Sequence, residues 1–121
     1  MADSGNHMAD TGNHTDIETL AERSALIALN AYVRRTHAQL PWHYGTSRLI
    51  LQIPHSSVAE EFVELKVTVV LPQTTHQPSY YIEGYYYHAG GTRSMMMDSL
   101  VPITNPRDAF GLIDWWVQRN A

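Results

Sequence analysis

The chain has 121 residues and a formal net charge of −4, with 44% hydrophobic and 17% charged residues. These proportions fit one globular domain and exclude a disordered chain. Lys66 is the single lysine and basic residues do not cluster, which argues against a nucleic-acid partner. The absence of cysteine excludes disulfides, thiolate catalysis and cysteine-based zinc sites.

The start of the chain carries a tandem heptapeptide, MADSGNH followed by MADTGNH. This repeat has too little apolar mass to offset the entropy lost on ordering, so residues 1–14 are expected to be a flexible tail ahead of one domain, 15–121. No basic and apolar secretory signal is visible, and no apolar run approaches the ~20 residues that span a bilayer. We therefore expect a cytoplasmic protein (host cytoplasm if the chain is viral) with no membrane partner.

A first helix is predicted from Thr15 to about Ala38, because Thr15 and Glu18 have the spacing of a capping box. It has two apolar faces, whereas a helix that covers one sheet face needs one. The second face requires another layer of the same chain or a second subunit, and we expect a subunit interface at Leu26, Leu29 and Val33. The opposite stripe consists of Ile17, Leu20, Ala21, Ser24, Ala28 and Ala31.

Four strands are predicted next, after a turn at residues 41–45, and a final helix begins at Pro106 with Asn105 as its cap and ends near Arg119. The links between strands are too short for crossover helices, so the strands are antiparallel. The fold class is therefore α+β, a two-layer sandwich of an N-terminal helix, a four-stranded meander and a C-terminal helix. The predicted strands are 47–53, 58–71, 79–88 and 94–103.

The third predicted strand is rich in tyrosine, and alternation puts one glutamate among phenols on a single face. So many tyrosines cannot all be core, and a carboxylate flanked by phenols is typical of a ligand pocket in a curled sheet. The pattern favours an outer sheet face on which aromatics and a charge form cross-strand pairs, and the alternative is such a pocket between the sheet and the first helix. The candidate binding residues are Tyr81, Glu83, Tyr85, Tyr87 and, from the turn, Trp42.

Two further features of the sheet can be predicted. Gly84 inside a strand indicates a bulge or kink. In the last strand, alternation would place Met95 and Met97 on one face and Met96 on the other. Core filling is the favoured use of these methionines. The alternative is a partner-binding surface, because methionine suits adaptable surfaces, and Met96 is the residue assigned to such an interface.

Signatures of catalysis are missing. The seven histidines show no metal-binding spacing, and the chain has neither a phosphate-binding glycine loop nor a nucleophile elbow. His88, Glu83 and Asp98 are the residues that a proton-transfer reaction could use. No catalytic residue, metal site or cofactor is assigned, and no pattern is specific to a family.

Two hypotheses follow. The first is a non-enzymatic protein-interaction module that acts as a homodimer and binds another protein, for example an accessory factor, an inhibitor or immunity protein, or a small chaperone. The second is a small-molecule-binding or proton-transfer enzyme domain with the tyrosine-lined pocket. The missing catalytic signature favours the first.

Overall fold

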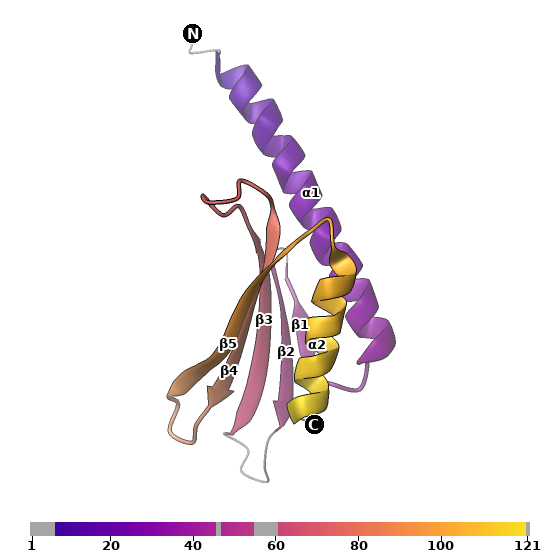
Figure 1. Cartoon of the computed structure of the whole chain (residues 1–121), viewed down its shortest axis with the longest axis vertical. Helices are drawn as coiled ribbons and strands as arrows, with labels where there is room; N and C mark the ends of the chain where they lie inside the picture. The colour runs from indigo at the N-terminus through magenta and orange to yellow at the C-terminus, as the bar shows by residue number, and fades with distance from the viewer. Residues whose placement is uncertain (1–6, 46, 55–60, 121) are drawn as a thin grey trace.

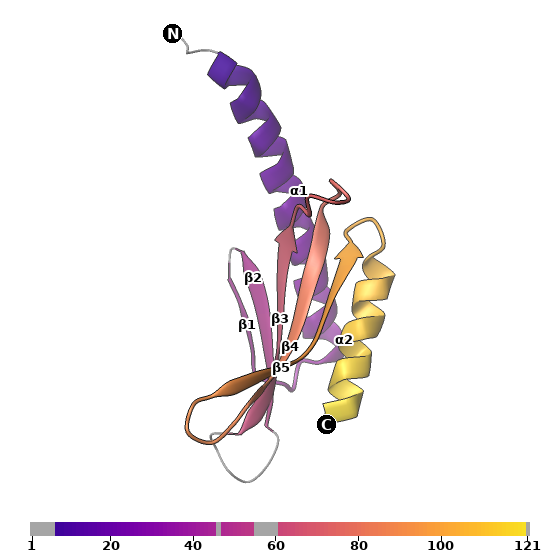
Figure 2. The ribbon, with the colours of Figure 1, turned by 60° about the vertical axis from the view of Figure 1, so that its left-hand side comes forward.

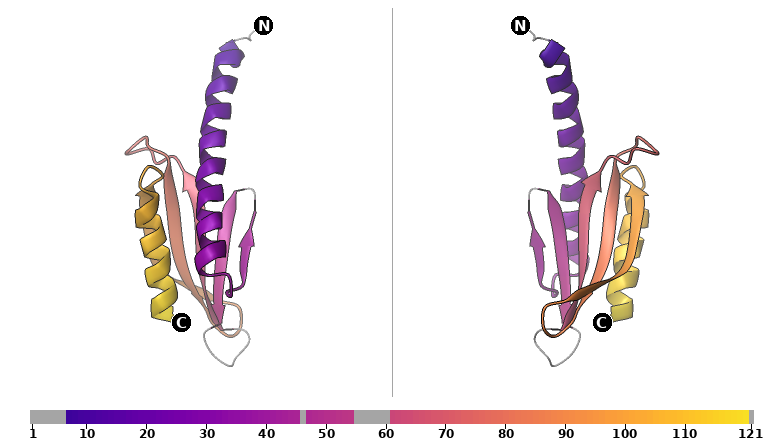
Figure 3. Two further views of the ribbon diagram at one scale, coloured as in Figure 1. Left: turned by 90° about the vertical axis from the view of Figure 1, so that its right-hand side faces the viewer. Right: turned by 90° about the vertical axis from the view of Figure 1, so that its left-hand side faces the viewer.

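The structure, a computed structural model, describes residues 7–45, 47–54 and 61–120. The α+β class is confirmed, with five strands where four were predicted (Figure 1). The sheet is an antiparallel meander in the order β1-β2-β3-β4-β5, and both helices lie on the same face of it (Figure 3). The elements are α1 (His7–Thr36), β1 (Trp42–Tyr44), β2 (Arg48–Pro54), β3 (Phe62–Val70), β4 (Ser79–Tyr87), β5 (Arg93–Pro102) and α2 (Pro106–Asn120).

The core lies between the sheet and the two helices. The alternation predicted for β3 is confirmed, because Val63, Leu65 and Val67 are buried on the face that the helices cover. We call this the inner face and the opposite one the outer face. The other buried residues of the cluster are Ala25, Leu29, Val33, Leu49, Leu51, Ile53, Tyr80, Ile82, Val101, Ala109, Ile113 and Trp116.

Helix α1 begins at His7, earlier than the predicted Thr15, and its N-terminal part projects beyond the sheet (Figure 1). Residues 1–6 of the expected tail lie outside the described residues. The interface predicted at Leu26, Leu29 and Val33 is wrong for this chain, since all three side chains are buried within it. The opposite apolar stripe of α1 is largely exposed where its side chains are described, with Leu20 open to solvent.

Strand β1 was predicted as part of a turn. Three residues are too few to show a periodicity, and the flanking proline and glycine indicate a turn. In the structure Trp42 pairs with Leu51 and Tyr44 with Leu49, so both aromatic side chains belong to the inner face.

The bulge predicted at Gly84 is confirmed by a register shift between Gly84 and Tyr85. Met97 lies opposite Gly84 and Met95 lies opposite Tyr85, so Met96 is the extra residue of β5. The prediction that Met95 and Met97 share a face is therefore wrong, because one extra residue reverses the alternation beyond it.

Candidate functional site

The tyrosine-rich strand β4 places its predicted binding residues together, but on the outer face. Tyr80, Ile82 and Gly84 take the inner face: the Tyr80 hydroxyl donates to the Ala25 carbonyl of α1 at 2.9 Å. Alternation then turns Tyr81, Glu83, Tyr85 and Tyr87 away from the helices. These four residues thus lie on an outer face, as the pattern favoured, and do not line the alternative pocket between sheet and first helix. Trp42 lies on the other side of the sheet.

Neither described helix covers the outer face, yet two of its glutamates are buried: Glu64 is 7% and Glu83 8% exposed. The end of the β4–β5 hairpin bends across this face (Figures 2 and 3). Neighbouring side chains complete the cover, since Phe62 stacks on Tyr87 with ring centroids 4.5 Å apart and the Arg93 guanidinium lies 4.2 Å from the centre of the Tyr85 ring.

Glu83 is bonded through both carboxylate oxygens. Its Oε2 accepts a hydrogen bond from the Tyr85 hydroxyl at 2.8 Å, and its Oε1 lies 3.5 Å from Nζ of Lys66, the chain's single lysine. The hydrogen bond to Glu83 raises the pKa of Tyr85, so this phenol stays a donor. A carboxylate with both oxygens engaged is poorly placed to act as a general base.

Glu64 repeats this arrangement on the neighbouring strand. Its Oε2 accepts from the Tyr87 hydroxyl at 3.2 Å and its Oε1 from Nε2 of Gln52 at 3.4 Å. Arg93 closes the row by donating from Nη1 to the Tyr87 oxygen at 3.3 Å. We call these bonded side chains the phenol–carboxylate network; its members are Gln52, Glu64, Lys66, Glu83, Tyr85, Tyr87 and Arg93.

Beside this network, Tyr81 donates to Oδ2 of Asp98 at 2.9 Å. That hydrogen bond raises the pKa of Tyr81 to about 12. Asp98, a candidate for proton transfer, therefore also has a protein partner. The outer face is a set of internally satisfied polar groups, which stabilises the sheet and leaves few groups free for a substrate.

A third group, which sequence reasoning missed, joins the two helices. Asp114 of α2 accepts a hydrogen bond from the Tyr32 hydroxyl, and its Oδ1 lies 2.7 Å from Nε2 of His37. Tyr32 also stacks on Phe110 with ring centroids 4.1 Å apart. His37 and Asp114 are 77 positions apart, so no local spacing could reveal the pair. Among the described residues His37 gains no hydroxyl partner that could serve as a nucleophile, and the contact ties α1 to α2.

Strand β5 is one of the two edges of the sheet. Among the described strands it pairs with β4 alone, so its other side has no strand beside it. Large apolar side chains are exposed on it: Met95 is 50%, Met96 59% and Leu100 49% exposed. The interface predicted at Met96 thus concerns an accessible residue.

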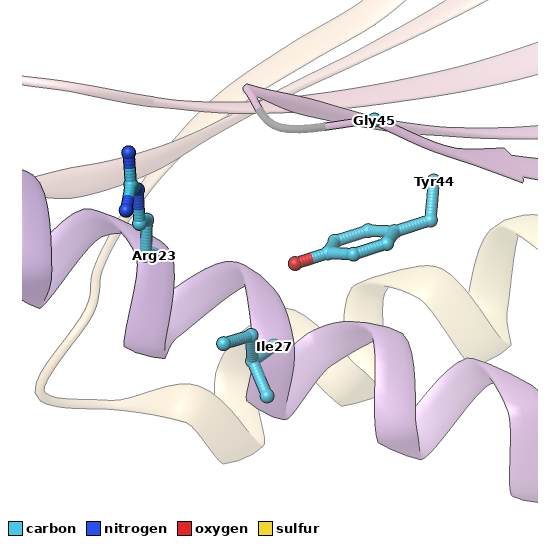
Figure 4. A pocket seen from close by; sticks show the side chains of 4 residues that line it. All are labelled: Arg23, Ile27, Tyr44 and Gly45. Carbon is cyan, nitrogen blue, oxygen red and sulfur yellow. The ribbon is translucent and has the colours of Figure 1, made fainter.

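A cavity of about 430 Å³ lies between α1 and the end of β1 (Figure 4). Arg23 and Ile27 line it from the helix, and Tyr44 and Gly45 from the strand. Sequence reasoning did not find it, because its two walls come from distant segments. Two other hollows border the outer face: one of about 200 Å³ at Trp42, His43, Ile50 and Gln52, and one of about 500 Å³ at Phe62, Tyr87, His88, Gly90 and Gly91.

Comparisons of the chain with family models, curated proteins and solved structures find no match. Within residues 7–45, 47–54 and 61–120, no three histidine, aspartate or glutamate side chains converge as metal ligands. Neither helix, in its described part, has a stretch long and apolar enough to cross a membrane. A functional argument therefore rests on the chain's own surfaces.

Proposed function

We propose that this protein is a non-enzymatic interaction module that acts as a homodimer, and that its two copies pair along β5. One observation carries the proposal: a ten-residue edge strand that exposes Met95, Met96 and Leu100 and has no neighbour on one side among the described strands. A long apolar edge can pair with another strand. The bulge at Met96 is a feature that can protect an edge, but Met95, Met96 and Leu100 stay exposed beside it.

The two edges of the sheet differ in this respect. Strand β1 has three residues, which is a short and therefore protected edge. Strand β5 has ten residues and contains a run of three methionines, Met95 to Met97. Methionine is enriched at protein interfaces, and a sheet continued through β5 would bury these side chains.

The charges of β5 suit pairing with a second copy of itself. Arg93 and Asp98 both lie on the outer face, opposite Tyr87 and Glu83. In an antiparallel pair with its two-fold axis between Met95 and Met96, Arg93 of each copy lies opposite Asp98 of the other. Opposite charges at such cross-strand positions are favourable, and the symmetry supplies the pair twice.

Light scattering over a range of concentrations tests the proposal. The intact chain should show twice the chain mass of 13.7 kDa. Leu100→Lys should shift it to the monomer, because a charge at the interface must be desolvated. Leu71→Lys is the matched control, since Leu71 is also 49% exposed but follows β3. A monomer at every concentration would contradict the proposal.

Charge reversal tests the register. Arg93→Asp and Asp98→Arg should each weaken the dimer, and the double variant should restore it if the two charges face each other across the axis. A dimer that survives all β5 variants but is lost in Ile27→Lys would instead place the interface on the exposed stripe of α1. The proposal includes a cytoplasmic location, which fractionation of expressing cells would test.

A further inference from the structure

The cavity between α1 and β1 has a chemical character that the proposed dimer does not use. We propose that it is a binding site for a small amphipathic carboxylate, a molecule with one carboxylate group and a short apolar body. The site is independent of the β5 interface, because β1 and β5 are at opposite ends of the strand order. Loss of dimerisation would therefore leave this inference standing, and the reverse also holds.

The hydroxyl of Tyr44 is the first observation. The phenol extends from β1 toward α1, and its oxygen faces the stretch of the helix that carries Arg23 and Ile27 (Figure 4). No described residue bonds to this hydroxyl, although the side chain is partly buried. The other six tyrosines each have a hydrogen-bond partner for the hydroxyl. Their hydrogen-bond partners are Asp114 for Tyr32, the Ala25 carbonyl for Tyr80, Asp98 for Tyr81, Glu83 for Tyr85, Glu61 for Tyr86 and Glu64 for Tyr87.

The second observation is the positive charge of Arg23. Its guanidinium lines the cavity and forms no ion pair with any described residue. Arginine binds a carboxylate through two parallel hydrogen bonds, and both its donors and the Tyr44 hydroxyl can point at one anionic group. An arginine and a hydroxyl that both lack a partner among the described residues favour an anion over an amine.

The third observation is that one wall of the cavity is apolar. Ile27 lies one helical turn after Arg23, so the two side chains share a face of α1. Ile27 is exposed, and together with the Tyr44 ring it offers apolar surface beside the charged group. A volume of about 430 Å³ lies in the range of small-molecule sites, which combine apolar walls with a few polar groups.

Gly45 lines the site without a side chain. A Cβ placed there would be in ordinary van der Waals contact with the Arg48 carbonyl and the His43 ring, both at 3.8 Å. The backbone N–H of Gly45 is already used, since it donates to the Arg48 carbonyl at 2.9 Å. Specificity for the anion therefore rests on Arg23 and Tyr44.

The experiment is an amide NMR titration of the full chain with octanoate, with octan-1-ol and octylammonium as probes of the same apolar length. Octanoate should shift the amides of Arg23, Ile27 and Gly45, and the two other probes should bind at least about tenfold more weakly, since a hydrogen bond to a charged group is worth about a factor of ten or more. Equal binding of octan-1-ol, or octanoate shifts confined to other residues, would overturn the inference.

Variants separate the site from nonspecific attraction. Arg23→Gln should weaken octanoate binding about tenfold and Tyr44→Phe by a smaller factor. Arg107→Gln is the matched control, because Arg107 is an exposed arginine on α2, away from the cavity. An equal loss in Arg107→Gln would reduce the effect to net charge and contradict a built site. Each variant's amide spectrum shows whether the fold is kept.

Discussion

The inner and outer faces of the sheet both bury side chains, but by different means. Leu65 and Glu64 are neighbours on β3, point to opposite faces and are both buried. On the inner face two helices supply the cover, and apolar packing supplies the free energy. On the outer face phenols and an arginine cover carboxylates, and every buried carboxylate oxygen has a partner. The comparison teaches that a sheet face without a helix can still be an interior.

The largest loss of stability is expected from a substitution in the core on the inner face. Leu29 is fully buried between α1 and the sheet, so Leu29→Ala should lower the free energy of unfolding by about 3 kcal/mol through lost transfer energy and a residual cavity. Leu20→Ala, on the exposed stripe of the same helix, should change it by less than about 0.5 kcal/mol. Urea denaturation measures both. Similar values for the two variants would contradict the assignment of the buried side of α1.

The second prediction concerns the contact between β4 and α2. A Cβ on Gly84 would lie 2.7 Å from Cη2 of Trp116, a buried ring that cannot move cheaply. Gly84→Ala should therefore destabilise by about 2 kcal/mol, as other overpacked cores do. Gly111 is an exposed position of α2, and a Cβ there meets nothing within 4 Å. Gly111→Ala should therefore raise the free energy of unfolding by about 0.5 kcal/mol. A stabilising Gly84→Ala in thermal or urea unfolding would rule out the close contact.

The inner face could be predicted from sequence to a large extent, and the outer face only in part. Alternation in β3 and the cap of α2 are local patterns, and both gave the observed elements. Gly84 predicted the bulge, but the extra residue that it requires is Met96 on the partner strand, which only the pairing reveals. The same holds for the choice between the two apolar stripes of α1, because local spacing does not say which stripe meets the sheet.

The face that carries the outer network could be predicted, but its bonding partners could not. Sequence reasoning grouped Tyr81, Glu83, Tyr85 and Tyr87 on one face, and the register places them so. It favoured an outer face of cross-strand pairs over a pocket under α1, and the four residues do lie on the outer face. Lys66, the partner of Glu83, and Arg93, the partner of Tyr87, lie on other strands, so no spacing within β4 could identify them. Long-range pairing, not local pattern, decides which polar groups become buried.

The third prediction tests whether the outer network is cooperative. Glu83→Gln should lower stability by about 2 kcal/mol, because Lys66 loses its partner and Tyr85 its acceptor, and Tyr85→Phe by about 1 kcal/mol. In a double-mutant cycle the two losses should overlap by at least about 0.5 kcal/mol. Strictly additive losses in urea unfolding would show that the two groups do not act together. Asp98→Asn, at an exposed site, is the control and should have the smaller effect.

The smallest predicted effect is a dependence of stability on pH at the rim of the outer face. The hydrogen bond to Asp98 raises the pKa of Tyr81 from 10.0 to about 12 in the folded chain. Between these two values the unfolded chain has lost this proton and the folded chain retains it. The contribution of Tyr81 is therefore complete below pH 10 and is lost as the pH rises toward 12.

Urea unfolding between pH 9 and pH 12 measures this dependence. Stability of the intact chain should fall with rising pH, and Tyr81→Phe should fall less steeply over the same range, because one of the phenols that hold a proton in the fold is gone. Tyr32, Tyr80 and Tyr85 have raised pKa values too and keep part of the slope in that variant. Asp98→Asn, which removes the charge that Tyr81 faces, should move the slope in the same direction as Tyr81→Phe. Identical slopes in all three proteins would mean that the exposed bond between Tyr81 and Asp98 is screened by water, and that coupling on the outer face is confined to its buried glutamates.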